Sequence, residues 1–505
     1  MNIKIPAVSS MLGLSLSLGA CASEGSTVDA FENGDGDGDG DGDGDGDGDG
    51  DGDGDGDGDG DGDGDGDGDG DGDGDGDGDG DGDGDGDGDG DGDGDGDGDG
   101  DGDGDGDGDG DGDGDGDGDG DGDGDGDGAP CDEGGNGGPL EWSYIWISNS
   151  AAGTVSKINT VTKNEEGRYF TGPLSTRDPS RTSVSLSGRY AAIANRDGGI
   201  SVIAARDEYC FDADSSGTIE TSTGPGDVLA WGTDECVLWN KNLPGTGTSG
   251  PRAVAWNIGD RDEETCIYER GDVWVGWGEG TTAKMRLLRG QDGATLVDAS
   301  AADLITGANS AYGGAIDADN NFWVTGSTRG GKLVKVAPDG TTTIYPNPNP
   351  TYMSDNGVHQ YGMALDPQGN PVVVTFISQQ MFRFDATTET WGNALSGFTS
   401  NRLRGMTVDA DGQAWVAMNE PCALALVDTT AMTFTDTDIE IPGCSEPVGV
   451  SIDAEGYVWI VDKGSNSAFK MDPETLTIEE VTGLDGPYTY SDMTGAGLAL
   501  QVQPQ

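Results

Sequence analysis

Four segments of the chain repeat one pattern, and this repetition constrains the fold more strongly than any other feature. They are GAIDADNNFWVTG from Gly314, GMALDPQGNPVVVTF from Gly362, GMTVDADGQAWVAM from Gly405 and GVSIDAEGYVWIVD from Gly449. Their spacings of 48, 43 and 44 residues are typical of β-propeller blades. Each segment alternates apolar and polar residues on both sides of an Asp/Gly turn, and a second alternating stretch follows it. Each repeat therefore predicts four antiparallel strands.

Three looser copies precede these four, and they begin at Trp142, Ser183 and Ala253. The first copy lacks its opening strand, whereas the segment GAGLALQV at residues 495–502 is left over after the seventh repeat. A ring whose two termini close it needs this arrangement, because closure removes the open sheet edge. We therefore expect residues 142–505 to form an all-β domain, a seven-bladed β-propeller of four-stranded blades that is closed by its C-terminal strand.

Two residue types recur within the repeats, and both have a structural explanation. Aspartates lie at the same turn in each copy, where a short acceptor side chain can bond nearby backbone amides: Asp317, Asp366, Asp409 and Asp453. Tryptophans recur on the second strand, where large aromatic side chains pack one blade on the next: Trp146, Trp274, Trp323, Trp415 and Trp459. We expect both sets to stabilise the fold and not to act in catalysis.

The repeat pattern G-[MVA]-x-[VIL]-D-x-x-G-x-x-W-V resembles that of the propeller family that contains NHL-type repeats and virginiamycin B lyase. The resemblance covers about residues 142–502. It implies the architecture but no single activity, because propellers carry many functions on one scaffold. The lyase's chemistry depends on histidines and a glutamate near a metal. This chain has one histidine, His359, and it has Gly326, Met418 or Asp462 where that glutamate is expected.

Ligand-binding residues of a propeller usually lie on the face where the inner strands begin and the second strands end. An arginine precedes the inner strand in three repeats and a tyrosine in a fourth: Arg181, Arg252, Arg404 and Tyr361. Polar residues follow the second strand in three repeats: Asn149, Asn195 and Asp462. Because guanidinium groups bind carboxylates and phosphates well, we predict a site for an anionic or carbonyl-bearing ligand. The alternative is that the arginines neutralise carboxylates on the rim.

These observations favour a non-catalytic binding or scaffold module for an unidentified ligand or protein, acting as a monomer. The enzymatic alternatives are a lyase and a lactonase, the second with carboxylates and an asparagine around a central calcium. Asp462, Asn149 and Asn195 could take the lactonase roles. No G-x-S-x-G, phosphate-loop or H-E-x-x-H motif occurs in the sequence, which supports the non-catalytic interpretation.

The net charge of −75 comes largely from residues 35–128, an uninterrupted Asp-Gly alternation with 47 aspartates. The rest of the chain still has 52 acidic against 24 basic residues. Nucleic acid is therefore not expected as a partner, because phosphate backbones need a basic footprint. The tract has mutually repelling charges and no apolar side chain to bury, so we expect a disordered linker over residues 22–141. A calcium-loaded β-roll is the alternative, but its repeats need an apolar residue in each turn.

Residues 1–21 have the form of an export signal. A basic start at Lys4 and a short apolar stretch precede L-G-A-C at residues 18–21, and this stretch is too short to span a bilayer. The pattern resembles a bacterial lipobox, which implies a signal peptide ending in a lipidated Cys21; an ordinary secretory signal is the alternative. Acyl chains would anchor the protein in a Gram-negative cell envelope. The residues after Cys21 lack an inner-membrane retention signal, so the outer membrane is favoured, with the lipid as the only membrane contact.

Six further cysteines in an exported chain favour disulfides. We expect Cys422 to pair with Cys444, and Cys210 with Cys236, whereas the pairing of Cys131 and Cys266 stays open. A metal site of cysteines is disfavoured because no C-x-x-C spacing occurs.

An insertion at about residues 207–250, expected between blades two and three, is similar to an EF-hand-type calcium loop. Oxygen ligands fall at positions 1, 3, 5, 7 and 9 of DADSSGTIETST: Asp212, Asp214, Ser216, Thr218 and Glu220. Gly217 at position 6 permits the sharp turn. Position 12 is Thr223 instead of a bidentate glutamate, so Asp227 is the candidate for the missing carboxylate. We predict a structural Ca²⁺ site of weak affinity, and an acidic loop without an ion is the alternative.

Overall fold

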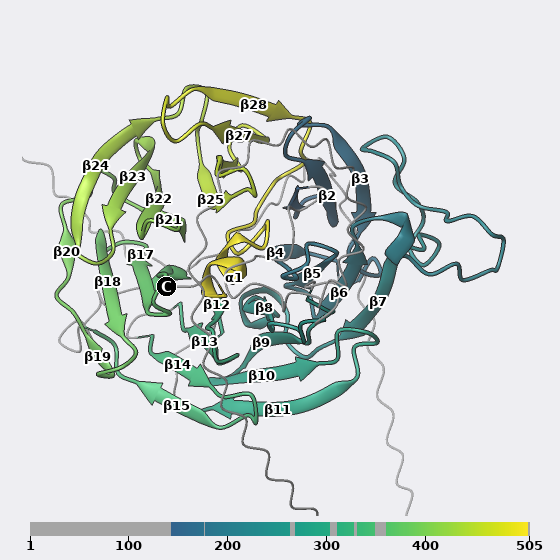
Figure 1. Ribbon diagram of the computed structural model, residues 1–505, viewed down its shortest axis with the longest axis horizontal. Coiled ribbons are helices and arrows are strands. Elements are labelled where there is room, and N and C mark those ends of the chain that lie inside the picture. The colour runs from purple at the N-terminus through teal and green to yellow at the C-terminus, as the bar shows by residue number, and fades with distance from the viewer. Residues whose placement is uncertain are drawn as a thin grey trace, which may run out of the picture. The chain divides into compact units, whose positions relative to one another are not determined.

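The computed structural model describes residues 143–502, apart from residue 176 and residues 263–267, 303–310, 328–330 and 349–359. Seven antiparallel sheets are arranged around a central axis (Figure 1). The predicted all-β fold, a seven-bladed β-propeller, is therefore confirmed. Several predictions concern residues outside the described part of the chain: the signal peptide with Cys21, the Asp-Gly linker, Cys131, Cys266 and His359.

In each blade the chain runs from the innermost strand outwards. Blade one contains β1 (Tyr144–Asn149), β2 (Thr154–Asn159) and β3 (Glu165–Phe170). Blade two contains β4 (Pro179–Val184), β5 (Tyr190–Asn195), β6 (Gly199–Ala204) and β7 (Val237–Asn242). Blade three contains β8 (Val254–Trp256), β9 (Val273–Glu279), β10 (Thr282–Leu288) and β11 (Thr295–Ala301). Blade four contains β12 (Gly313–Ile316), β13 (Phe322–Thr325), β14 (Leu333–Val336) and β15 (Thr342–Tyr345).

The last three blades follow the same order. Blade five contains β16 (Gln360–Leu365), β17 (Pro371–Thr375) and β18 (Gln380–Asp385), whose outer edge pairs with β19 (Thr390–Trp391) and β20 (Leu395–Ser396). Blade six contains β21 (Leu403–Val408), β22 (Gln413–Asn419), β23 (Cys422–Asp428) and β24 (Thr433–Glu440). Blade seven contains β25 (Pro447–Ile452), β26 (Val458–Asp462), β27 (Ser467–Met471) and β28 (Ile478–Thr482). Inner strands such as β21 are buried throughout, whereas outer strands such as β28 are partly exposed, so the core surrounds the axis.

The recurrent aspartate fixes the hairpin between the first two strands of a blade. In blade seven, Asp453 accepts two backbone N–H groups of the turn at 3.0 Å and the indole N–H of Trp459 at 2.9 Å. The same hydrogen bond from the indole N–H recurs in two other blades. In blade four Trp323 donates to Asp317 at 2.8 Å, and in blade six Trp415 donates to Asp409 at 2.9 Å. Blade five has no tryptophan there, and Asp366 forms an ion pair with Arg383 at 2.7 Å instead. The aspartates therefore have the structural role that the repeats predict.

The recurrent tryptophans pack the blades on one another, as expected. Four of the five are fully buried, and Trp415 is nearly so. Trp274 of blade three stacks on Phe322 of blade four, with ring centroids 5.6 Å apart. Burial of such large aromatic side chains contributes strongly to the stability of the ring.

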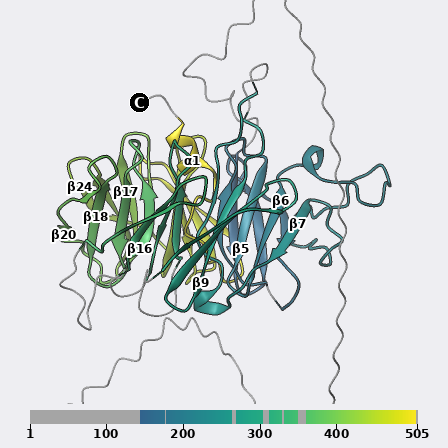
Figure 2. The ribbon, with the colours of Figure 1, turned by 90° about the horizontal axis from the view of Figure 1, so that it is seen from below.

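The C-terminal segment contradicts the predicted closing strand. Residues 496–501 form the helix α1 (Ala496–Gln501), which lies at one face of the ring (Figure 2). The buried carboxylate of Asp492 accepts the backbone N–H groups of Gly497 and Leu498 at 3.2 and 3.0 Å, so it caps the start of the helix. A side-chain acceptor at this place favours a helical turn over an extended strand. The alternating apolar residues of GAGLALQV gave no sign of this cap.

Residues 486–493, which we call the closing segment, lie along the inner edge of β1 in place of the predicted strand. Three backbone hydrogen bonds of 2.9 to 3.1 Å join the two: Ser150 N–H to Gly486 O, Tyr488 N–H to Ser148 O, and Trp146 N–H to Met493 O. Blade one has three named strands in the described part of the chain, and the closing segment supplies partners at its inner edge.

The insertion lies within blade two and not between blades two and three. It connects β6 to β7, because the chain returns to pair with β6 before it leaves the blade. It projects from the outer edge of the ring beside β7 (Figure 1). Both expected disulfides, Cys210–Cys236 and Cys422–Cys444, are formed. Within the described residues, no helix has the length and hydrophobicity that crossing a membrane requires.

Two C-terminal truncations should separate the roles of α1 and the closing segment. Removal of residues 495–505 should preserve cooperative unfolding, because the hydrogen bonds to β1 stay. Removal of residues 486–505 should abolish it, because the inner edge of β1 loses its partners. Thermal and urea unfolding followed by circular dichroism measures both. A long truncation that melts like the full chain would contradict this closure, and an equal loss in both variants would assign the closing role to α1.

Candidate functional site

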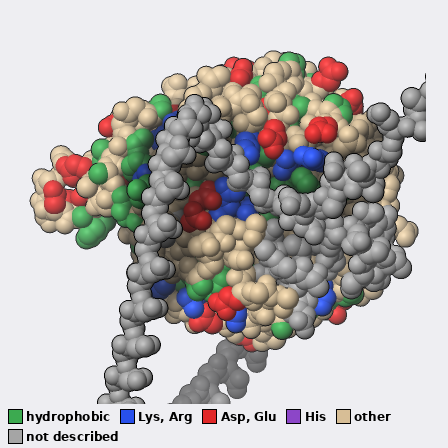
Figure 3. Space-filling model, turned by 180° about the vertical axis from the view of Figure 1, so that it is seen from behind, with side chains coloured by type: hydrophobic (Ala, Val, Ile, Leu, Met, Phe, Trp, Pro, Cys, Tyr) green, Lys and Arg blue, Asp and Glu red, His purple; other side chains and the backbone are tan. Residues whose placement is uncertain are grey.

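The inner strands of blades two to six each carry a large polar side chain near their start: Arg181, Arg252, Tyr312, Tyr361 and Arg404. All five are buried, with at most 7% of the side chain exposed. Helix α1 contacts the inner strands at their far ends, where the side chain of Gln501 donates a hydrogen bond to the backbone carbonyl of Asp366. The five side chains lie near the starts of these strands, so they are at the end of the channel opposite α1. Figure 3 views the ring from the side opposite to Figure 1 and shows Lys and Arg side chains beside Asp and Glu side chains near the middle of this face.

Four tyrosines fill this end of the channel, and we call them the tyrosine cluster. Tyr312 and Tyr361 come from the blades, and Tyr488 and Tyr490 come from the closing segment. The hydroxyl of Tyr490 contacts that of Tyr312 and lies 3.0 Å from that of Tyr488, which is 3.1 Å from the hydroxyl of Tyr361. The rings of Tyr361 and Tyr490 are stacked, with centroids 5.1 Å apart. All four hydroxyls therefore belong to one hydrogen-bonded group.

The three predicted arginines surround the tyrosine cluster but do not have the same partners. The guanidinium carbon of Arg181 lies 3.1 Å from the ring centroid of Tyr490 and 4.7 Å from that of Tyr312. Arg252 lies 5.0 Å from the ring centroid of Tyr312. The structure thus brings Arg181 and Arg252, which we call the guanidinium pair, onto one tyrosine ring.

Arg404 lies on the other side of the stacked tyrosines and already has a counter-charge. Its Nη1 donates to the hydroxyl of Tyr361 at 3.1 Å, and its Nη2 donates to Oε1 of Glu446 at 2.8 Å. The prediction that arginines neutralise rim carboxylates therefore fits Arg404. Among the described residues, no carboxylate lies within ion-pair distance of the guanidinium pair.

At the three predicted arginines, several buried guanidinium nitrogens have no hydrogen-bond partner among the described residues. They are Nη2 of Arg181, Nε and Nη1 of Arg252, and Nε of Arg404. A buried charge without partners is strongly unfavourable, and proteins normally compensate it with an opposite charge or with hydrogen bonds. The guanidinium pair therefore has donors and positive charge available for an anion.

The electrostatics of the cluster single out Tyr490. Burial alone would raise its pKa, but Arg181 and Arg252, together with hydrogen bonds from Tyr312 and Tyr361, lower the pKa of Tyr490 below its ordinary value. Burial raises the pKa of Tyr312 well above the ordinary value, and it raises the pKa of Tyr361 to about 12. Burial would also lower the pKa of Arg252, but the neighbouring tyrosines more than offset this effect. Any negative charge within the cluster is thus most stable on Tyr490.

The other predicted ligand residues are held in backbone hydrogen bonds. Asn149 Oδ1 accepts the N–H of Asp485 at 3.0 Å, and Asn195 Oδ1 accepts that of Asp178 at 3.1 Å. Asp462 accepts two N–H groups at 2.6 Å, from Ser445 and Glu446. Each side chain thus fixes the segment that leads into an inner edge. Asp462 also positions Glu446, the carboxylate that pairs with Arg404.

Reasoning from the sequence missed Tyr312, Tyr488 and Tyr490. Tyr312 directly precedes Gly313 at the start of an inner strand, as Tyr361 precedes Gly362, so the repeat register could have identified it. Tyr488 and Tyr490 could not be found in this way, because the expected closing strand, residues 495–502, was placed after both of them.

The channel itself has little free space. A cavity of about 50 Å³ lies between the inner strands and α1, lined by residues such as Ser183, Thr407, Asp492 and Leu498. This volume is enough for a few water molecules and far below the roughly 300 Å³ of typical organic-ligand pockets.

The carboxylates at the predicted calcium loop differ from the expected ligands in one residue: Glu235 is present in place of Asp227. Carboxylate oxygens of Asp212, Asp214 and Glu235 lie within 4.8 Å of one another. The candidate Asp227 is instead bonded to Thr223, whose N–H and hydroxyl it accepts at 3.2 and 2.9 Å. Glu235 was missed because it lies outside the loop motif. These three carboxylates could hold a hard cation such as Ca²⁺, which prefers oxygen ligands.

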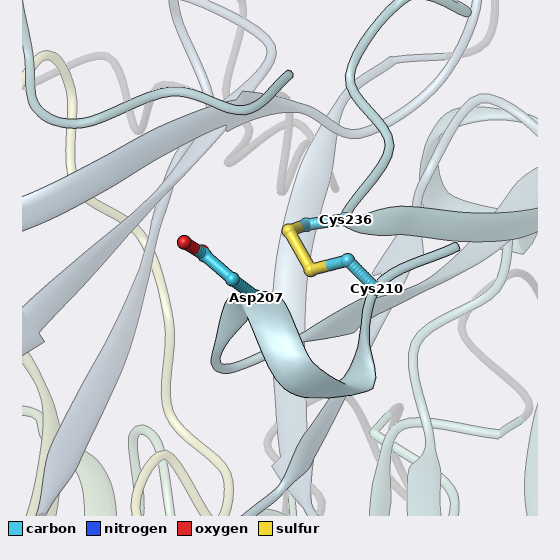
Figure 4. A group of neighbouring side chains, drawn as sticks. All are labelled: Asp207, Cys210 and Cys236. Carbon is cyan, nitrogen blue, oxygen red and sulfur yellow. A yellow bond between two sulfur atoms is a disulfide. The ribbon is translucent and has the colours of Figure 1, made fainter. Parts of the chain in front are cut away.

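The disulfide of the insertion explains how Glu235 reaches the loop. Figure 4 shows the Cys210–Cys236 bond with Asp207 beside it. Cys236 directly follows Glu235, and Cys210 lies two residues before Asp212, so the bond holds the two ends of the insertion together. Oxidised cysteines supply no thiolate ligand, so the neighbouring Asp207 does not form a metal centre with them.

Comparisons with known proteins concern the fold. No protein-family model matches the sequence, and neither does any curated protein. Virginiamycin B lyase from Staphylococcus aureus is 14% identical over 64% of this chain and 93% of its own, with a TM-score of 0.44. A functionally unknown protein from Desulfotomaculum acetoxidans is 12% identical over 69% of this chain and 100% of its own, with a TM-score of 0.48.

A third similar structure is a candidate 6-phosphogluconolactonase from Bacteroides fragilis. It is 13% identical over 69% of this chain and 97% of its own, with a TM-score of 0.47. At these identities the likeness concerns the propeller fold alone, because propellers with unrelated activities share it.

Proposed function

We propose that the propeller is a non-catalytic binding module that holds a small anionic ligand at the arginine end of its channel. One observation carries this proposal: the guanidinium pair is buried, has unbonded N–H donors and has no carboxylate partner among the described residues. Arginine donors bind carboxylate and phosphate oxygens in a planar, often bidentate geometry. Arg404 and Tyr361 complete the wall of the site.

The ligand class follows from the charge and the space of the site. Two adjacent cations favour a carboxylate, sulfate or phosphate group. The tyrosine cluster fills the channel behind them, so the rest of a larger ligand or protein partner would extend outwards. Asn149, Asn195 and Asp462 are left out of this proposal, because backbone hydrogen bonds already account for their side chains.

The N-terminal part of the chain suggests where this module works. We infer that lipidated Cys21 anchors the protein in the outer membrane of a Gram-negative bacterium, and that the Asp-Gly linker holds the propeller away from the surface. The lipobox-like LGAC and the 47 repelling aspartates support this inference. Gly-rich coil statistics give roughly 50 to 60 Å between the ends of such a linker, and charge repulsion extends it further.

We also infer a structural Ca²⁺ in the insertion, held by Asp212, Asp214 and Glu235 with oxygens of Ser216, Thr218 and Glu220. The convergence of three carboxylates supports the inference. Glu235 would take the place of the glutamate that is missing at position 12.

Anion binding by the guanidinium pair can be tested with sulfate and acetate as probes in isothermal titration calorimetry. Both should bind in the millimolar range. Arg181→Gln with Arg252→Gln should weaken binding at least about 100-fold, because two charge-assisted hydrogen bonds of about 1.5–3 kcal/mol each are lost. Arg289→Gln is the control, since Arg289 pairs with Asp292 on the surface. Unchanged binding in the double variant, while the variant keeps its fold, would rule out this site.

Calcium should raise the melting temperature of the domain. At about 10 mM Ca²⁺ and a dissociation constant of roughly 10⁻⁴ to 10⁻³ M, the gain in unfolding free energy is about 1.4–2.7 kcal/mol. Asp212→Ala with Asp214→Ala should remove this gain, and Glu235→Gln should reduce it. Asp227→Asn should leave it unchanged, because the carboxylate of Asp227 accepts hydrogen bonds from Thr223 and does not join the three clustered carboxylates. An equal gain in the double variant would place the ion elsewhere.

Replacing Cys21 with Ser should release the protein from the membrane fraction, since the acyl chains supply nearly all of the membrane affinity. Shortening the Asp-Gly tract should leave the fractionation unchanged but reduce access of antibody to the propeller on whole cells. Membrane fractionation and surface labelling measure the two effects. A Cys21→Ser protein that still sediments with membranes would show that another anchor exists.

A further inference from the structure

Among the described residues, the positive charge around the tyrosine cluster is not balanced by carboxylates. The titratable and charged groups that face the cluster are Arg181, Arg252, Arg404, Arg196, Lys463, Asp178 and Glu446. Two of the cations are paired, Arg196 with Asp178 at 2.6 Å and Arg404 with Glu446 at 2.8 Å. Lys463 lies at the margin, 5.8 Å from the ring of Tyr488. Two buried positive charges, those of the guanidinium pair, are therefore left without a described carboxylate.

Tyr490 is the acidic group closest to these charges. Its ring lies directly against the guanidinium group of Arg181, with 3.1 Å between the guanidinium carbon and the ring centroid. Its hydroxyl contacts the hydroxyls of Tyr312 and Tyr488. An ionised Tyr490 oxygen could accept hydrogen bonds from both, and hydrogen bonds to the charged form stabilise it.

We propose that Tyr490 is ionised in the ligand-free protein and serves as the internal counter-ion of the guanidinium pair, and that it takes up a proton when an anionic ligand binds. The uptake of a proton by Tyr490 rests on the proposed function, because it requires that an anion binds at Arg181 and Arg252. The proton comes from solvent and forms one O–H bond at Tyr490. The guanidinium charges then face the ligand's oxygens instead of the phenolate.

The rest of the cluster explains why Tyr490 is the residue that ionises. Tyr361 receives a hydrogen bond from Arg404, but Glu446 already neutralises that arginine. The ring centroid of Tyr312 lies 4.7 Å and 5.0 Å from the guanidinium carbons of Arg181 and Arg252. The ring centroid of Tyr490 is closer, at 3.1 Å from the guanidinium carbon of Arg181. The directions of the pKa shifts agree with this order. The pKa of Tyr490 is lowered, because the two arginines and its hydrogen bonds together outweigh burial, whereas burial raises the pKa of Tyr312 and of Tyr361.

The coupling predicts how binding depends on pH. Above the pH at which Tyr490 ionises, an incoming anion must be accompanied by one proton. The apparent dissociation constant should therefore rise by about tenfold per pH unit there, and it should be independent of pH below that range. Sulfate and acetate suit this test because their own charges do not change over the range.

The experiment is a pH titration of the full chain, followed by the near-ultraviolet absorbance of tyrosinate, with and without sulfate. The wild type should show one tyrosinate below the ordinary tyrosine pKa of about 10, and Tyr490→Phe should lack it. Sulfate should diminish this absorbance. Tyr312→Phe should shift the transition to higher pH, because one hydrogen bond to the phenolate is lost. Tyr345→Phe, which alters a tyrosine bonded to Glu389 outside the cluster, should leave it unchanged.

The outcomes separate this inference from the proposed function. If wild type and Tyr490→Phe have the same absorbance below the ordinary tyrosine range, the counter-ion is not Tyr490, whether or not sulfate binds. If the early tyrosinate is present and sulfate binds without reducing it, the coupling is wrong while the anion site stands. If the early tyrosinate is present and neither anion binds, the proposed function fails and the counter-ion assignment is supported.

Discussion

The inner edge of the first sheet must be covered, because the unpaired backbone groups of an edge strand need hydrogen-bond partners. The closing segment covers it by returning from the far end of the chain to β1. The same return places Tyr488 and Tyr490 at the channel end where the inner-strand arginines lie. Closure of the ring and formation of the candidate site therefore depend on one segment of eight residues, 486–493.

The second constraint is charge inside a strongly acidic protein. Arginines at the start of three inner strands are buried, and only Arg404 has a carboxylate partner among the described residues. A chain with so many carboxylates could readily supply partners for the other two. Tyrosines surround them instead, and tyrosines offer ring faces, hydroxyls and one ionisable proton each. Within the described part of the chain, such a lining leaves the positive charge of Arg181 and Arg252 without a carboxylate partner.

The sequence predicted the repeat-based part of the molecule well. Seven blades, the turn aspartates and the packing tryptophans follow from local patterns that recur, and recurrence makes such patterns visible. The two disulfides were predicted from the even number of cysteines in an exported chain. The errors lie where one contact is made only once. Asp492 turns residues 496–501 into a helix, Glu235 joins the calcium loop through a disulfide, and Tyr490 reaches Arg181 across more than 300 residues of chain. Neither spacing nor periodicity encodes contacts of this kind.

Arg181 and Arg252 are proposed to hold an anion at the end of the channel. A high-resolution crystal structure of the protein, grown with selenate in place of sulfate and measured at the selenium edge, would locate that anion. We expect one anomalous peak within hydrogen-bond distance of Nη2 of Arg181 and of Nε or Nη1 of Arg252. A carboxylate side chain paired with each guanidinium group, and no anomalous peak between them, would contradict it.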